Sequence, residues 1–568
     1  MILKRNDEVS IVLCGEAGQG IQTVERFLTR VLKFDGFNVF STKEYMSRVR
    51  GGLNSTEIRV SSSSVRAYVD RIDILVTLKK GSLEHLKKRI TGDTLILGEK
   101  LNVDDGYAFV EMPFTQIAIE VGDKIFSNTV AVSAIAALLG VSLETIEEYL
   151  KKFFVKKGVE VVNKNLLAAT KGYELGSGLV KSGKMTVNIK RDLSIKDDLI
   201  FDGASAIGLG AIAGGCNFIS SYPMTPSTGI LTFLSEHSKE FGIVAEQAED
   251  EISAINMAIG AWYAGASAMV TTAGGGFALM VEGVSLAGMI ESPIVINLGQ
   301  RPAPATGLPT RTEQGDLLFA LYSGHGEFPK IILAPGTLED AFNLTRKAFY
   351  FADKFQVPVF IMSDQYLVDS YYNVKNVDLP KDEPERFIVK TSKEYRRYSL
   401  TENGISPRGI PGFGDGLVDV DSDEHDESGH ITEDLDLRVK MVDKRLKKFD
   451  SIRSEIVPPE FIGSKNYETL IVGWGSTYPI IKEAVESLGD KKLAFLSPKE
   501  LYPFHPDVKK YLEKAKKRII IENNATAQFA KLVKVETGFD FDQKILKYNG
   551  LPFSVEEIVS ELKKLAGE

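Results

Sequence analysis

The sequence predicts a multidomain α/β protein. Short apolar runs typical of buried strands, such as residues 9–14, 268–272 and 293–298, alternate along the chain with segments of helical periodicity. Glycine-rich turns follow several of these runs, as expected where the strands of a parallel sheet pass into helices. A length of 568 residues, at roughly 100 to 200 residues per domain, corresponds to about three or four domains.

Composition limits the partners that the chain can have. Its net charge of -9 disfavours nucleic acid and membrane surfaces, because such polyanions bind clustered Lys and Arg. No signal-peptide core and no apolar run long enough to span a membrane is evident, so we expect a cytoplasmic protein. Cys14 and Cys216 lie far apart and cannot by themselves supply the four thiolates of an iron–sulfur site. We expect both to be buried free thiols.

The first α/β domain is predicted over residues 1–175. Its first strand, residues 9–14, leads into a turn with the glycine spacing G-x-x-G-x-G, which differs from the spacing of dinucleotide-binding loops. A nicotinamide site is therefore not expected. A tight strand-to-helix turn and a ligand-binding loop are about equally good interpretations of these glycines, because either structure needs small residues. Residues 176–196 are rich in Gly, Ser and Lys, which predicts a linker.

A second α/β domain is predicted over residues 197–378. Its candidate site residues each follow a strand: Tyr222 and Thr225 the first, Gly274 and Gly275 the second, Arg301 and Thr310 the third. Because ligands gather at the carboxyl ends of parallel strands, one cleft could hold all of these residues. The two glycines would let backbone N–H groups approach a ligand, although a close helix contact explains them equally well.

Glu251 begins a helix in the same domain. Glu251, Ile255 and Ile259 follow one another at helical spacing, so the carboxylate points along a packed helix face. Glu246 and Glu249 precede it closely. Taken alone, acids near the start of a helix are more often charges favoured by the helix dipole than catalytic groups.

The remainder divides into a polar connecting segment, residues 379–465, and a last α/β domain, residues 466–568. The connecting segment contains an acidic run with His425, followed by His430. Their spacing matches no closed zinc site, so we predict a solvated loop there.

Three segments together resemble the alpha subunits of the 2-oxoacid:ferredoxin oxidoreductases. They are SSYPMTPSTG at residues 220–229, EQAEDE at residues 246–251 and GQRPAPATGLPT at residues 299–310. The resemblance covers nearly the whole chain. It implies a gamma-type α/β domain, whose glycine loop and residues 47–52 help to form the coenzyme A region or a subunit contact. A thiamine diphosphate pyrimidine-type domain and a transketolase C-terminal-like domain would follow.

The resemblance also implies roles for the candidate residues. Glu251, selected over Glu249 and Glu246 by its distance from the Ile259-Gly260-Ala261 segment, would hydrogen-bond the aminopyrimidine ring of thiamine diphosphate. Arg301 would bind the substrate carboxylate, whose two oxygens suit a guanidinium, although pairing with an acid at a subunit interface is the alternative. The remaining implied contacts are Thr225, Tyr222 and Thr310 with the substrate, and Thr225, Gly274 and Gly275 with the cofactor.

The same resemblance implies partners. A separate beta subunit would bind the diphosphate, Mg²⁺ and a [4Fe–4S] cluster, in a dimer of alpha–beta heterodimers. Coenzyme A would be the co-substrate, and ferredoxin or flavodoxin would accept the electrons. Gly414-Asp415-Gly416 lacks the Asn-containing continuation of the metal motif of thiamine enzymes, so we reject it as a metal site.

The substrate and the class of activity have alternatives. 2-Oxoglutarate is favoured as the substrate, with pyruvate or a branched-chain or aryl 2-oxoacid as alternatives. A non-catalytic assembly or nucleotide-sensing protein and a non-oxidative transketolase-like enzyme are the alternative classes.

Overall fold

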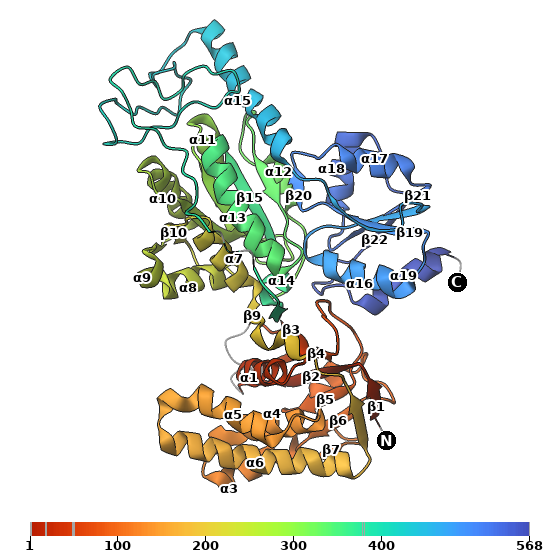
Figure 1. Cartoon of the computed structure of the whole chain (residues 1–568). Helices are drawn as coiled ribbons and strands as arrows, with labels where there is room; N and C mark the ends of the chain where they lie inside the picture. Colours follow the sequence, from red (N-terminus) through yellow and green to blue (C-terminus); the bar gives the residue numbers. More distant parts are fainter. Residues whose placement is uncertain (1–2, 17–19, 48–51, 378, 380, 567–568) are drawn as a thin grey trace. The chain divides into compact units, whose positions relative to one another are not determined.

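The computed structural model describes residues 3–16, 20–47, 52–377, 379 and 381–566. They form two compact units (Figure 1). Unit 1 comprises Met1–Phe201, Asp369–Asn376 and Ser554–Glu556, and unit 2 comprises Asp202–Val368, Val377–Phe553 and Glu557–Glu568. Both units combine sheets with helices, so the predicted multidomain α/β architecture is confirmed.

Unit 1 is built on an eight-stranded sheet. In spatial order its strands are β7 (Val110–Glu111), β6 (Leu95–Gly98), β5 (Ile74–Thr77), β2 (Glu8–Glu16), β4 (Leu53–Ser61), β3 (Asn38–Glu44), β16 (Tyr371–Val374) and β9 (Leu199–Asp202). β2, β5, β6 and β7 run parallel, whereas β4 is antiparallel to β2 and β3, and β16 is antiparallel to β3. β1 (Leu3–Asn6) and β8 (Met185–Asn188) form a separate parallel pair.

The helices of unit 1 are α1 (Ile21–Phe34), α2 (Ser82–His85), α3 (Phe114–Val121), α4 (Ser127–Leu138), α5 (Leu143–Phe154) and α6 (Val159–Lys181). α4 is almost entirely buried and packs against α6. The contact is close because α6 presents glycines to it: β-carbons on Gly172 and Gly176 would overlap the carbonyl oxygens of Val130 and Ala134.

The linker predicted over residues 176–196 is wrong. Residues 176–181 are the last turns of α6, β8 pairs with β1, and a 3-10 helix spans Leu193–Asp197. The glycines that suggested flexibility serve close helix packing instead, as at Gly176. The polypeptide then passes through β9 before it enters unit 2.

Unit 2 contains a seven-stranded sheet and a five-stranded sheet. The larger sheet has the order β11 (Val244–Gln247), β10 (Phe218–Ser221), β12 (Ala268–Ala273), β13 (Ile294–Gln300), β15 (Pro358–Asp364), β14 (Ile331–Leu333) and β20 (Glu500–Tyr502). Only β20 is antiparallel to its neighbour. The smaller sheet has the order β17 (Glu460–Gly463), β19 (Leu493–Ser497), β18 (Thr469–Val472), β21 (Lys517–Glu522) and β22 (Gln543–Leu546).

Helices cover both faces of the larger sheet. α10 (Glu251–Tyr263) and α11 (Gly274–Met289) pack against each other and against β12 and β13, whereas α7 (Gly203–Ala213), α8 (Thr228–Glu236) and α13 (Leu338–Phe355) form the other layer. Connections between parallel strands are right-handed, so the direction in which a connection crosses the sheet decides which face its helix covers. α10 and α11 cross the sheet in the opposite direction to α8 and α13, and they therefore cover the opposite face. The other helices of unit 2 are α9 (Ser238–Phe241), α12 (Leu317–Tyr322), α15 (Leu435–Glu455), α16 (Tyr478–Leu488), α17 (Asp507–Lys514) and α18 (Gln528–Thr537). Most residues of α14 (Gln365–Asp369) and α19 (Val555–Ala566) also belong to unit 2.

Buried ion pairs attach the polar connecting segment to the larger sheet's helices. Glu291, just after α11, is 2% exposed and bonds Lys444 through Oε1 at 2.5 Å and Lys448 through Oε2 at 2.6 Å. Both lysines lie on α15. The two ammonium groups hold the pKa of Glu291 well below its usual range although the carboxyl is buried. This part of the segment is therefore joined to the core by charge as well as by packing.

The predicted solvated loop is wrong at His425. That side chain is fully buried, and its ring centroid lies 4.0 Å from that of Tyr398. Its Nδ1 lies 2.9 Å from the carbonyl oxygen of Asp423. His430, in contrast, is exposed as predicted. Aromatic packing, which the acidic composition of this run concealed, explains the difference.

Two further findings concern predictions from composition. Cys14 and Cys216 are both free and buried, as predicted, and burial raises the pKa of each thiol to about 12. Across the described ranges, no helix combines the length and the apolar character needed to cross a membrane.

Candidate functional site

Glu251 is a buried acid at the first position of α10. Asp250 caps the helix by accepting a hydrogen bond from the Ser253 N–H at 2.8 Å. The Glu251 side chain is therefore not needed as the cap. It is 3% exposed, and its Oε1 has no hydrogen-bond partner in the described part of the chain. Burial raises the pKa of Glu251 above its ordinary value, which favours the protonated acid.

The first turn of α11 faces this carboxyl group. A β-carbon on Gly276 would overlap Glu251 Oε1 and the hydroxyl of Thr272, so any other residue there would require one of these side chains or α11 to move. The neighbouring glycines differ from it: a β-carbon on Gly274 would stand 2.7 Å from both carboxylate oxygens of Asp316, whereas one on Gly275 would meet only the carbonyl of Ala305 at 3.8 Å. Gly276 is thus the glycine that contacts Glu251.

Thr225 and Arg301 come from neighbouring loops at the same edge of the sheet. Thr225 follows β10 and Arg301 follows β13, and Arg301 Nη1 donates a hydrogen bond to the Thr225 carbonyl at 2.6 Å. The two loops pack closely, because a β-carbon on Gly299 would stand 2.9 Å from Pro226 Cγ. The other N–H groups of Arg301 have no hydrogen-bond partner among the described residues, so they are available to an anion.

Asp316 and Glu313 are site residues that the sequence interpretation missed. Both lie in the loop between Arg301 and α12, and Asp316 is 7% exposed. Burial raises the pKa of Asp316 to about 6, against the opposing effect of the Arg301 charge. Burial, reinforced by the charge of Asp316, raises the pKa of Glu313 to about 7. A signal was present: Glu313 and Asp316 follow Thr310 by three and six residues, in the loop that supplied the other candidates.

Tyr222 and Thr310 lie on the outer parts of the same edge. The Tyr222 side chain is 40% exposed in the loop after β10, and Thr310 is half-buried in the loop after β13. Glu246 and Glu249 are exposed, unlike Glu251. The structure thus places Glu251 against the first turn of α11, joins Arg301 to Thr225 and leaves the two alternative glutamates in solvent.

The smaller sheet packs against this loop. Gln314 donates from Nε2 to the Trp474 carbonyl at 2.8 Å and accepts from the Asn523 N–H at 3.0 Å. Both partners lie at the carboxyl ends of strands of the smaller sheet, β18 and β21. The loop that carries Arg301, Glu313 and Asp316 is therefore fixed at both sheets.

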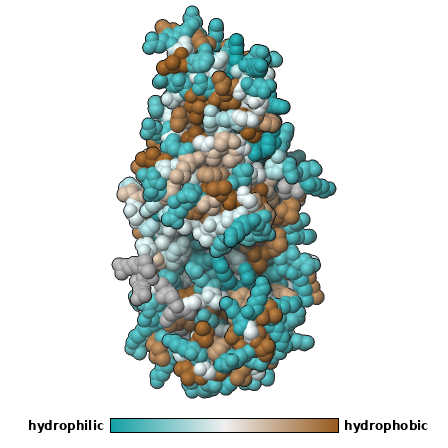
Figure 2. Space-filling model, turned by 90° about the vertical axis from the view of Figure 1, so that its left-hand side faces the viewer, coloured by the Kyte–Doolittle hydropathy of each residue, from teal (hydrophilic) through white to brown (hydrophobic). Residues whose placement is uncertain are grey.

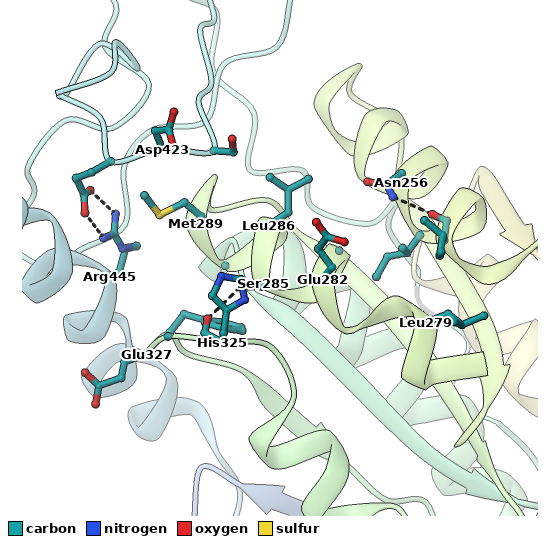
Figure 3. Close-up of a pocket in the computed structure, with 18 of the residues that line it drawn as sticks. Asn256, Leu279, Glu282, Ser285, Leu286, Met289, His325, Glu327, Asp423 and Arg445 are labelled. Carbon is teal, nitrogen blue, oxygen red and sulfur yellow. Dashed lines mark hydrogen bonds and ion pairs between the residues drawn. The ribbon is translucent and has the colours of Figure 1, made fainter. Parts of the chain in front are cut away.

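A groove of about 700 Å³ is lined by residues of α10 and α11, by the segment around His325 and by the segment around Asp423 (Figure 3). Its walls carry three carboxylates, Glu282, Glu327 and Asp423, which have no cationic partner among the described residues. Ile252 and Leu279 are 48% and 49% exposed on the same face. In Figure 2, where the left-hand side of Figure 1 faces the viewer, apolar side chains lie among polar ones across the upper part of the molecule. This face of unit 2 is thus apolar with an acidic margin.

Two segments that the sequence analysis singled out in the first domain fall partly on residues that the structure does not describe. The glycine loop after β2 includes residues 17–19, and the segment predicted at residues 47–52 includes residues 48–51, which lie outside the described residues. Within those that are described, no group of three or more His, Cys, Asp or Glu could hold a metal ion.

Comparison with known proteins places this chain in a family. Residues 209–444 match the family described as pyruvate flavodoxin/ferredoxin oxidoreductase, thiamine diP-bdg, and residues 10–175 match the pyruvate ferredoxin/flavodoxin oxidoreductase family. The chain is similar to a 2-oxoacid:ferredoxin oxidoreductase subunit alpha from Sulfolobus sp, with 32% identity over 98% of this chain and 97% of the relative. It is also similar to the 2-oxoglutarate synthase subunit KorA of Archaeoglobus fulgidus, with 36% identity over 57% of this chain and 88% of the relative.

A solved structure extends this similarity to three dimensions. The 2-oxoglutarate:ferredoxin oxidoreductase from Magnetococcus marinus, with 2-oxoglutarate, coenzyme A and succinyl-CoA bound, aligns with a TM-score of 0.91 at 31% identity. The alignment covers 98% of this chain and 99% of that one. The similarity therefore extends across both units and supports the resemblance seen in the three site segments. The chain belongs to the alpha subunits of the 2-oxoacid:ferredoxin oxidoreductases.

Proposed function

We propose that this oxidoreductase subunit acts on 2-oxoglutarate, with coenzyme A as co-substrate and ferredoxin or flavodoxin as electron acceptor. The reaction would yield succinyl-CoA and CO2. Two findings support this substrate: the Magnetococcus marinus relative holds 2-oxoglutarate, coenzyme A and succinyl-CoA, and the Archaeoglobus fulgidus relative is named a 2-oxoglutarate synthase subunit. Pyruvate and branched-chain or aryl 2-oxoacids are the substrates against which 2-oxoglutarate should be compared.

The residues around Glu251 fit the aminopyrimidine ring of thiamine diphosphate. The carboxyl group is buried, one of its oxygens is unbonded, and the glycine opposite leaves space that any side chain would fill. Burial keeps a proton available on the acid. When bound, thiamine diphosphate supplies the carbon nucleophile and the electron sink that decarboxylation of a 2-oxoacid requires. The unbonded carboxyl oxygen of Glu251 is the observation that carries this proposal.

The other residues of the site would bind and orient the substrate. Arg301, held by its hydrogen bond to the Thr225 carbonyl, presents its remaining N–H groups to the 2-oxoacid carboxylate. The Thr225 hydroxyl would hydrogen-bond the substrate, with Tyr222 and Thr310 completing the substrate pocket. Gly274 and Gly275, at the start of α11, would let backbone N–H groups approach the cofactor.

The diphosphate, Mg²⁺ and a [4Fe–4S] cluster would lie on a beta subunit. A cluster of this type is held by four thiolates, and this chain offers two buried cysteines, one in each unit. Gly414-Asp415-Gly416 does not replace the missing metal motif, because a β-carbon on Gly416 or Gly414 would overlap the backbone around Thr391 and Ser392. Those glycines serve close backbone packing, and a dimer of alpha–beta heterodimers would complete the enzyme.

We infer that the beta subunit covers the face of α10 and α11 described above. The face is continuous with the site, because Ile252 follows Glu251 directly. Its apolar centre and three unpaired carboxylates fit a partner surface with apolar residues and Lys or Arg. Leu279→Glu and Glu282→Lys should weaken the complex, as measured by sedimentation velocity. The matched control is Val535→Glu on α18, where Val535 is 71% exposed; equal binding by Leu279→Glu would place the interface elsewhere.

Replacement of Glu251 tests the catalytic proposal. Glu251→Gln retains the shape of the side chain but removes its acidic proton, so the complex should assemble and lose most of its turnover. Glu249→Gln, at an exposed position two residues earlier, is the control and should behave as the parent enzyme. Turnover of each variant would be followed as 2-oxoacid-dependent viologen reduction in the assembled complex. Near-normal turnover of Glu251→Gln would remove the glutamate from the proposed role.

A further inference from the structure

We propose that Asp316 and Glu313 form an acid pair that takes up one proton when the carboxylate of a 2-oxoacid binds Arg301. This inference rests on the proposed role of Arg301. It gives the two acids of the loop before α12 a role in substrate binding that is separate from any role in folding. The pair would make the affinity for the substrate depend on pH.

Asp316 is placed close to the carboxylate-binding position. Its backbone N–H donates to Gln300 Oε1 at 3.2 Å, and Gln300 is the residue directly before Arg301. Its side chain packs on Gly274, at the start of α11. Asp316 is 7% exposed, and its Oδ2 has no hydrogen-bond partner in the residues described. A purely structural buried carboxylate would normally be hydrogen-bonded at both oxygens.

The charges that reach Asp316 are few. Arg301 at the end of β13 is the opposing cation, and Glu313 in the same loop is the neighbouring acid. α11 packs against Asp316 with a first turn of three glycines, and α12, which follows it directly, has the uncharged sequence LLFALY. The pKa of Asp316 therefore depends chiefly on burial and on Arg301, and the charge of Asp316 in turn raises the pKa of Glu313.

Substrate binding would change this balance in one direction. In the free enzyme, the positive charge of Arg301 favours ionised Asp316. A bound 2-oxoacid carboxylate would neutralise that charge and add a second anion beside two acids whose pKa values, about 6 and about 7, already lie near neutrality. One carboxylate of the pair then takes a proton from solvent and becomes a neutral carboxylic acid, while the substrate remains an anion.

The direction of the pH effect follows from this step. Below the pKa values of the pair the acids are already protonated, so the substrate carboxylate binds without repulsion. As the pH rises through these pKa values, substrate binding requires the uptake of a proton whose concentration in solution is falling. The affinity for the substrate therefore falls. The KM for 2-oxoglutarate should rise roughly tenfold between pH 6 and 8, because linkage to a single proton changes an affinity by at most about tenfold per pH unit.

The test compares variants in the assembled complex. Asp316→Asn and Glu313→Gln should each flatten the pH dependence of KM and lower KM at pH 8, with a smaller effect on kcat. Glu236→Gln, an exposed acid on α8, is the control and should retain the parent profile. A loss of packing alone would lower activity at every pH without changing the slope. Parent slopes in both Asp316→Asn and Glu313→Gln would overturn the proposal.

A binding measurement provides an independent readout if Asp316→Asn does not fold. Glutarate, a dicarboxylate without the 2-oxo group, should bind the complex at pH 7 with net proton uptake, seen as a calorimetric heat that changes with buffer ionisation enthalpy. Binding without proton uptake would contradict the acid pair. Unchanged KM in Arg301→Lys at every pH would instead contradict the role of Arg301, whereas a raised KM there together with parent slopes in both Asp316→Asn and Glu313→Gln would reject the acid pair alone.

Discussion

The Oε1 atom of Glu251 lies where a β-carbon of residue 276 would otherwise project, so Gly276 and Glu251 fit together only because Gly276 lacks a side chain. The two residues begin or nearly begin successive helices, α10 and α11, which pack against each other. The absence of a side chain at Gly276 therefore leaves room for the carboxyl group, whose Oε1 has no hydrogen-bond partner within the described residues.

This contact predicts the effect of Gly276→Ala. The added methyl group would force Glu251 or α11 to move. This overpacking should lower the free energy of unfolding by about 1 to 3 kcal/mol and should also lower turnover. Thermal unfolding and viologen reduction would measure the two effects. Gly260→Ala on α10 is the control, because a β-carbon there meets nothing within 4 Å and should be neutral or stabilising. Parent-like turnover in Gly276→Ala would show that the carboxyl position is not critical.

Arg301→Lys separates charge from geometry. Lysine retains the positive charge but cannot hold the Thr225 carbonyl and a carboxylate with one planar group. Loss of a charge-assisted pair is worth about 1.5 to 3 kcal/mol, so kcat/KM for 2-oxoglutarate should fall roughly 10- to 150-fold while the complex stays assembled. Steady-state kinetics and gel filtration would measure the two outcomes. Dissociation of the complex, with normal kinetics in the fraction that remains, would support the alternative that Arg301 serves a subunit interface.

Lys448→Met tests the buried ion pairs of the connecting segment. Lys448 is 1% exposed at its side chain, and its Nζ bonds Glu291 Oε2 and the Gln356 carbonyl. Its removal leaves part of a buried carboxylate uncompensated, so we expect a loss of about 3 kcal/mol in the free energy of unfolding of the chain. Lys447→Met, at the neighbouring exposed position, should change stability by less than about 0.5 kcal/mol. Denaturant unfolding of both variants would decide, and equal stabilities would argue against the cluster as an anchor.

The isolated chain should contain no iron and should not reduce viologen with any 2-oxoacid. The physical reason is that its two cysteines are buried in different units and their thiol pKa values are raised to about 12, so neither is a ready thiolate ligand. Metal analysis and the viologen assay, with and without a cysteine-bearing partner subunit, would check this. Turnover by the chain alone would contradict the division of the active site between two polypeptides.

The sequence was most informative where chemistry and topology coincide. Arg301 and Thr225 each follow a strand of a parallel sheet, so their convergence could be predicted from the order of strands, and the structure joins them by a hydrogen bond. Glu251 was separated from Glu249 by the family resemblance, through its distance from the Ile259-Gly260-Ala261 segment, and the structure buries Glu251 and leaves Glu249 exposed. The carboxyl-end rule is sufficient for Arg301 and Thr225.

Contacts between distant segments could not be predicted from the sequence. Gly176 belongs to a helix that packs on α4, yet by composition it looked like part of a linker. His425 is buried against Tyr398 although acids surround it in the sequence. The raised pKa of Asp316 likewise depends on burial by separate elements. Each of these features depends on contacts between residues that are remote in the sequence. Neither composition nor hydrophobic periodicity gives information about such contacts.

The strand β16 has a consequence for how the protein is made. It pairs with β3 through Tyr371 opposite Ser41 and Tyr372 opposite Phe40, within a unit that is otherwise formed almost entirely by the start of the chain. During synthesis at roughly 5 to 20 residues per second, the β3 edge would await its neighbour for on the order of tens of seconds. An unpaired strand edge is a template for wrong pairing between chains. The nascent protein therefore passes through an aggregation-prone stage that ends only when the ribosome has translated most of the second unit's larger sheet.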